Sequence, residues 1–160
     1  KSAYGYKGMG DLFVFIFFGL VSTLGTYYLF GHTLDLHIIF PAIGIGLLSI
    51  AVLNMNNMRD VENDTLMKKN TLVVKMGFEK AKQYHYFLIV FATIVFNLFA
   101  INSFSEWYQY LYVIGFIPLL KNIGTVAKTK NPRLLDPELK RISLTTFLIS
   151  LLLSIALILN

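Results

Sequence analysis

Carboxylates and amides gather in the stretch NMNNMRDVENDTLMKKNTLVVKMG, residues 54–77. Asn56, Asp60 and Asp64 are each four residues apart, so on a continuing helix their side chains share one stripe. Asn57 lies one position to the side. Because Mg²⁺ binds a few carboxylate oxygens, keeps several waters and takes its remaining ligands from phosphates, this stripe suits a magnesium site.

Basic residues accompany the acidic stripe on both sides. They are Arg59, Lys68, Lys69 and Lys75. Such cations neutralise phosphate oxygens that a metal does not reach, so the whole set favours a site for a diphosphate. The alternative is an ordinary solvated loop, in which each surface ion pair contributes about 0–1 kcal/mol. The spacing alone leaves both interpretations open.

Five apolar segments must position these residues. The chain has 160 residues, of which 56% are apolar and 14% are charged, whereas soluble domains have about 45–50% and about 25%. A helix that spans a bilayer needs about 20 apolar residues. The segments are 11–30, 38–55, 85–101, 108–127 and 142–159. We predict an all-α membrane protein, with residues 1–160 as a single transmembrane unit and the motif in a loop at 56–84.

The position of the motif favours the functional interpretation. Asn54, Asn56 and Asn57 begin the polar stripe inside an apolar segment, where apolar side chains would cost less free energy.

The absence of Cys excludes disulfides, thiolate metal sites and thiol nucleophiles.

The fourteen Lys and Arg residues all fall at or nearer one face of the predicted unit. The links at 31–37 and 102–107 contain neither residue type. Since Lys and Arg favour cytoplasmic loops, residue 1 and the 56–84 loop are predicted to be cytoplasmic, in a multi-pass protein of the cell inner (plasma) membrane. The net charge of +5 then reflects the orientation of the protein in the membrane and its attraction to lipid headgroups. No RNA- or DNA-binding motif accompanies it, so nucleic acid is excluded as a partner.

The segment NNMRDVENDTLMKKNTLVVKMG resembles the second acidic motif of the UbiA superfamily of intramembrane prenyltransferases. GDLFVFIFFG at 10–19, GTYYLFG at 25–31 and TLVVKMG at 71–77 resemble the branch that prenylates 1,4-dihydroxy-2-naphthoate in menaquinone synthesis. The resemblance covers essentially the whole chain. It implies the last five helices, the C-terminal part, of a nine-helix bundle with a central cavity and two acidic motifs. This chain carries only the second motif, so the first is expected in a missing N-terminal half, and the chain alone is expected to be incomplete as an enzyme.

The resemblance also implies a role for each motif residue. Asp60 and Asp64 would be Mg²⁺ ligands, and Asn56 or Asn57 would orient them. Arg59, Lys69 and Lys75 would contact the diphosphate of a polyprenyl donor, with Lys68 beside them. The acceptor would be aromatic, with dihydroxynaphthoate implied by the branch. The isoprenoid tail needs an apolar groove open to lipid, for which aromatic walls are offered by Phe13, Phe15, Phe17, Phe18, Tyr27 and Tyr28.

Two alternatives accompany this hypothesis. Asp11 begins the first segment, where its carboxylate either caps the helix or, because it belongs to the resembling stretch, binds substrate. The chain could instead be a fragment of a transporter or channel whose polar residues line a pathway. The clustering of charge at one face disfavours a transporter, since transporters place broken helices and charges near the bilayer midplane.

Overall fold

The computed structural model describes residues 8–31, 33 and 35–159, and all regular structure in these residues is helical. In chain order the elements are α1 (Gly10–Val14), η2 (Phe15–Val21), α2 (Ser22–Gly31), η3 (Leu36–Ile38), α3 (Ile39–Arg59), α4 (Val61–Leu66), α5 (Leu72–Met76), α6 (Phe78–Ser103), η4 (Trp107–Gly115), α7 (Phe116–Lys128), η5 (Pro132–Leu135) and α8 (Asp136–Ile158). The predicted all-α class is confirmed. Residue 1, predicted to be cytoplasmic, lies outside the described residues.

Within the described residues, five helical stretches are long and apolar enough to cross a membrane, as the sequence predicted. They are Gly10–Gly31, Leu36–Arg59, Phe78–Ser103, Trp107–Lys128 and Pro132–Ile158. The third begins well before the apolar run at 85–101, because the charged residues after Gly77 continue the helix. Gly77 has φ +83°, which only glycine adopts readily, and it separates α5 from α6. The link between the second and third stretches is therefore 60–77, and it contains α4 and α5.

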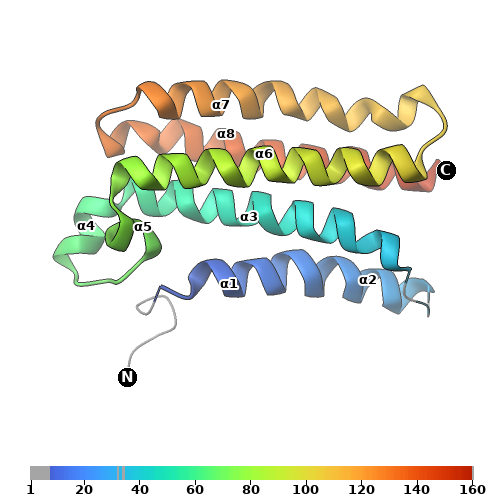
Figure 1. The fold of residues 1–160 in the computed structure, drawn as a ribbon, viewed down its shortest axis with the longest axis horizontal. Helices are drawn as coiled ribbons and strands as arrows, with labels where there is room; N and C mark the ends of the chain where they lie inside the picture. Colours follow the sequence, from blue (N-terminus) through green and yellow to red (C-terminus); the bar gives the residue numbers. More distant parts are fainter. Residues whose placement is uncertain (1–7, 32, 34, 160) are drawn as a thin grey trace.

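Helix α3 is the central element of the bundle. It packs against the first stretch, α6 and α8, whereas α7 packs against α6 and α8 (Figure 1). In its most apolar window 50% of the residues are buried, against 6% for Gly10–Gly31. The first stretch therefore presents most of its surface to lipid or to further protein.

Two glycines let the first stretch approach α3 closely. A Cβ atom at Gly19 would lie 2.7 Å from the Cα of Gly46. The two helices run in opposite directions (Figure 1). Asp11 lies eight residues before Gly19, and Asn54 lies eight residues after Gly46. Because each residue advances a helix by about 1.5 Å, the crossing places Asp11 level with the polar end of α3.

The charged elements lie at one end of the bundle. Helices α4 and α5, the start of α1 and the link between α7 and α8 are all at the left in Figure 1. The links at the other end are those without Lys or Arg. The five helices thus hold the acidic motif at the basic end of the bundle.

Candidate functional site

The predicted stripe of Asn56, Asp60 and Asp64 is held by a nearly continuous helix. Helix α3 ends at Arg59, and α4 begins at Val61. The backbone N–H of Asp60 donates to the carbonyl of Asn56 at 3.0 Å, and that of Asp64 donates to the carbonyl of Asp60 at 2.8 Å. Since both hydrogen bonds join residues four apart, the one-turn spacing continues through Asp60.

A tight turn after α4 brings Lys69 back to Asp64. Lys68 has φ +54°, and its N–H donates to the carbonyl of Thr65, while the N–H of Lys69 donates to the carbonyl of Asp64 at 2.9 Å. This pair of bonds is a Schellman motif, which ends a helix with a residue in the left-handed region. The turn returns the Lys69 ammonium to the Asp64 carboxylate, with 2.8 Å between Nζ and Oδ1.

Six of the predicted site residues line one pocket of about 240 Å³. They are Asp11, Asn56, Asn57, Asp60, Asp64 and Lys69. Gly8, Gly10, Leu53, Thr71 and Leu72 complete the wall. Asp64 is buried, whereas the Asp60 side chain is 35% exposed. One carboxylate is therefore fixed inside the pocket, and the other is open to its mouth.

Arg59 lies beside Asp60 and ties it to the start of α8. Its guanidinium donates to both carboxylate oxygens of Asp60, at 2.8 and 2.9 Å, to Oδ1 of Asn56 at 2.9 Å and to Oδ1 of Asp136 at 2.9 Å. The hydrogen bonds from Arg59 lower the pKa of the Asp60 carboxyl below its ordinary value. Partial burial opposes the lowering, and the charges of Arg59 and Lys69 add to it. Asp60 is therefore ionised at neutral pH.

Asp11 enters the pocket from the first helix. Its carboxylate is buried and accepts a hydrogen bond of 3.0 Å from the hydroxyl of Tyr84 on α6. The N-cap position of α1 is Met9, and no side chain of the described residues caps the helix there. The structure thus joins Asp11 to α6 and to the acidic pocket.

Three predicted residues do not line this pocket: Arg59, Lys68 and Lys75. Lys68 is exposed at the αL turn. Lys75 lies closer, because a Cβ atom at Gly8, a residue of the pocket wall, would come within 2.7 Å of the Lys75 Nζ. Arg59 faces a second hollow of about 250 Å³ with Glu62, Arg133 and Asp136.

An apolar groove of about 560 Å³ adjoins the polar pocket. The two hollows share Leu53 and Asn56. The groove is lined by α1, η2, α3 and α8, through Val14, Phe18, Ser49, Val52, Leu53, Asn56, Leu139, Ser143 and Thr146. Of the aromatic residues predicted to form walls, Phe18 lies here, and Tyr27 lines a further groove of about 420 Å³.

Three residues in or beside the site were not predicted from the sequence: Tyr84, Thr71 and Asp136. Thr71 accepts a hydrogen bond of 3.3 Å from the N–H of Val74 as the N-cap of α5. A Thr before an apolar helical run is a recognisable cap signal, so this residue could have been found. Nothing in the local sequence around Tyr84 or Asp136 links them to the motif.

The donor set fits a magnesium ion that also binds phosphate. Among the described residues, no group of three or more His, Cys, Asp or Glu side chains is placed to hold a metal. Asp60 and Asp64 nevertheless line one pocket together with two amide side chains. Because Mg²⁺ is commonly held by one or two carboxylates plus substrate phosphates, a two-carboxylate site suits it.

The fold and the site define an all-α membrane protein with a two-carboxylate pocket at one end of its helices. The pattern of the UbiA prenyltransferase family matches residues 3–144, so the chain belongs to that family.

Two curated relatives that match most of this chain carry the same enzyme name. The chain is 44% identical over 157 residues to a 1,4-dihydroxy-2-naphthoate octaprenyltransferase of Haemophilus influenzae, covering 98% of this chain and 51% of the relative. It is 40% identical over 141 residues to the enzyme of the same name from Escherichia coli, covering 86% of this chain and 45% of the relative. The chain therefore spans about half the length of these relatives. No solved structure matches.

Proposed function

We propose that this chain forms the C-terminal part of a prenyltransferase that moves a polyprenyl group from an allylic diphosphate to 1,4-dihydroxy-2-naphthoate in menaquinone synthesis. The observation that carries the proposal is the joint pocket of Asp60, Asp64 and Lys69 beside an apolar groove. The names of the curated relatives support the choice of donor and acceptor. The basic end of the bundle would lie on the cytoplasmic side of the cell inner membrane.

The charges in the pocket favour a metal-bound diphosphate over a free one. The pocket is lined by three acidic side chains, Asp11, Asp60 and Asp64, and by one basic side chain, Lys69. The guanidinium of Arg59 is already shared between Asp60 and Asp136. A free diphosphate would therefore meet net repulsion, whereas bound Mg²⁺ would supply the missing positive charge and stabilise the departing diphosphate.

The proposal divides the roles at the site among carboxylates, amides and cations. Asp60 and Asp64 would bind Mg²⁺, Asn56 and Asn57 would orient them, and Lys69 would contact diphosphate oxygens. Arg59 holds the Asp60 carboxylate in one orientation through two hydrogen bonds. Lys75 and Lys68 would then contribute positive charge from outside the pocket wall.

The groove next to the pocket would hold the first part of the isoprenoid chain. In the transfer, the allylic C–O bond breaks and its electron pair leaves with the diphosphate. A ring carbon of the acceptor forms the new C–C bond, and in the naphthoate branch the ring carboxylate leaves as carbon dioxide. The shared residues Leu53 and Asn56 lie where the polar and apolar hollows meet, so the reacting carbon would lie near them.

Replacement of the two aspartates tests the proposal. In membranes that contain the full-length protein, Asp60→Asn and Asp64→Asn should each lower Mg²⁺-dependent prenyl transfer to dihydroxynaphthoate by about 100-fold or more. Glu62→Gln is the matched control, because Glu62 lies between the two aspartates in the chain but outside the pocket. If the aspartate variants are as active as Glu62→Gln at equal expression, the assignment of Asp60 and Asp64 is wrong.

A further inference from the structure

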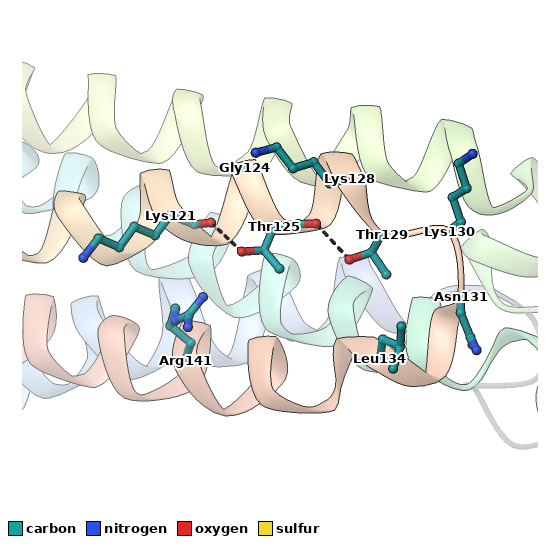
Figure 2. A pocket seen from close by; sticks show the side chains of 9 residues that line it. All are labelled: Lys121, Gly124, Thr125, Lys128, Thr129, Lys130, Asn131, Leu134 and Arg141. Carbon is teal, nitrogen blue, oxygen red and sulfur yellow. Dashed lines mark hydrogen bonds between the residues drawn. The ribbon is translucent and has the colours of Figure 1, made fainter.

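A further hollow lies between α7 and α8 and shares no lining residue with the acidic pocket. It is an open groove of about 770 Å³ near the basic end of both helices. Its lining consists of Lys121, Gly124, Thr125, Lys128, Thr129, Lys130, Asn131, Leu134 and Arg141 (Figure 2). Four of these nine residues are basic, and none is acidic. We call this hollow the α7–α8 groove.

Three of the four cations in the α7–α8 groove lack a counter-charge. Lys121, Lys128 and Lys130 form no ion pair with any described residue, whereas Lys69 is paired with Asp64. The guanidinium of Arg141 is bound to the buried carboxylate of Glu138. Uncompensated positive charges held together repel one another, so the groove favours an anionic ligand.

The side chains surround the groove from several directions. In Figure 2, Arg141 extends from α8 towards α7, Lys121 and Lys128 lie along α7, and Lys130 lies on the link between the two helices. Lys121 lies seven residues before Lys128, which on a helix is about 10 Å deeper into the membrane. The cations therefore extend along the helix axis from the end of the bundle into the membrane. An anion that stays in bulk water would not contact all of them.

Apolar surface continues from the groove along the two helices. Leu120 and Ile117 on α7 are 67% and 56% exposed, and Phe147 and Leu144 on α8 are 67% and 57% exposed. Gly124 leaves the floor of the groove open, because a Cβ atom there would meet nothing within 4 Å. A ligand that matches this surface has an anionic head and long apolar chains.

We propose that the α7–α8 groove binds the headgroup of an anionic phospholipid, with its acyl chains along the exposed apolar side chains of α7 and α8. Basic pockets between membrane helices bind such headgroups because each Lys or Arg near the surface contributes attraction to anionic lipid. The site is separate from the acidic pocket and does not depend on the proposed prenyl transfer.

The test measures lipid retention by the full-length protein. Protein purified in detergent is mixed with equal amounts of phosphatidylglycerol and phosphatidylcholine of the same chain length, and bound lipid is counted by native mass spectrometry. We expect phosphatidylglycerol to be preferred and the preference to weaken as salt rises. Lys128→Gln with Lys130→Gln should reduce phosphatidylglycerol binding about 30-fold, from about 1 kcal/mol for each lysine. Lys140→Gln is the charge control, because it removes an exposed α8 lysine outside the groove.

A second variant tests the shape of the groove with all four cations present. Gly124→Leu fills the open floor and should reduce phosphatidylglycerol binding, whereas Gly25→Leu, whose surroundings are equally open, should not. Equal retention of the two lipids, an equal effect of Lys140→Gln, or no effect of Gly124→Leu would each overturn the proposal. Displacement of phosphatidylglycerol by inorganic diphosphate at similar concentration would also overturn it, since the groove would then be a site for free anions.

Discussion

The ion pair between Asp64 and Lys69 allows a quantitative test of the site. The Asp64 side chain is 5% exposed and the Lys69 side chain is 36% exposed. Lys69→Met removes the ammonium but keeps most of the apolar stem, so the Asp64 carboxylate stays buried without this partner. Loss of one partner from a buried pair costs about 3–5 kcal/mol, and loss from an exposed pair costs about 0–1 kcal/mol.

Since Lys69 is one-third exposed, we expect Lys69→Met to lower the free energy of unfolding by about 2 kcal/mol, between those limits. For a chain of this size, that corresponds to a fall in Tm of about 4–8 °C. Circular dichroism at the helical band, recorded during heating in detergent, measures the change. Lys80→Met, at an exposed lysine on α6, is the matched control and should leave Tm nearly unchanged.

Two further measurements decide whether the cost comes from the buried charge. The double variant Asp64→Asn with Lys69→Met should recover more than half of the lost stability, because an amide needs no counter-charge. Added Mg²⁺ should raise the Tm of Lys69→Met more than that of the unchanged protein, since the metal replaces the lost positive charge. If the two single effects simply add in the double variant, the ion pair does not explain the stability of this turn.

Three other predictions follow from particular contacts. Lys68→Gly should raise the free energy of unfolding by about 1 kcal/mol, measured as a higher Tm, because Lys68 has φ +54° and glycine adopts that conformation without strain; an unchanged or lower Tm would contradict this. The pKa of Asp60 is lower in the folded protein, so its contribution to stability is present above the ordinary pKa of 3.8 and is lost as pH falls through the lower folded value. The Tm of Arg59→Gln should therefore fall below that of the unchanged protein above about pH 4, with the difference disappearing in stronger acid; a difference that is constant with pH would assign the effect to packing. Asn122→Leu should lower the free energy of unfolding by about 1–3 kcal/mol, measured by thermal unfolding, because buried Asn122 links His85 on α6 to Glu138 on α8. An unchanged Tm would show that this hydrogen-bond network does not stabilise the fold.

The helical stripe could be predicted because it depends on local geometry. Asn56, Asp60 and Asp64 are one turn apart, and the structure keeps that spacing through hydrogen bonds between residues four apart. The number of long helices could also be predicted from the apolar segments. In lipid, only a helix or a closed barrel satisfies the backbone hydrogen-bonding groups of such a segment. The resemblance placed Asp11 near the site, and the crossing at Gly19 and Gly46 explains how the helices bring it there.

The partners of Arg59 and Asp11 could not be predicted, because they come from distant parts of the chain. Asp136 is 77 residues from Arg59, and Tyr84 is 73 residues from Asp11. Neither residue belongs to a periodic pattern, so only the packing of α6 and α8 against the other helices reveals them. The turn at Lys68 was also hidden, since lysine is an unusual residue in a left-handed conformation.

The contacts of Arg59 change the interpretation of the last helix. Asp136 opens α8 and binds Arg59, which in turn holds Asp60. Three residues further on the same helix, Leu139 begins the α8 wall of the apolar groove. One rigid helix thus contributes to the orientation of a proposed metal ligand and to the surface proposed for the isoprenoid chain. Since a helix transmits displacement along its axis, a shift of α8 on filling the groove would act on Asp60 through Arg59. Under the proposed function, α8 and the acidic motif would together set the spacing between the isoprenoid chain and the diphosphate.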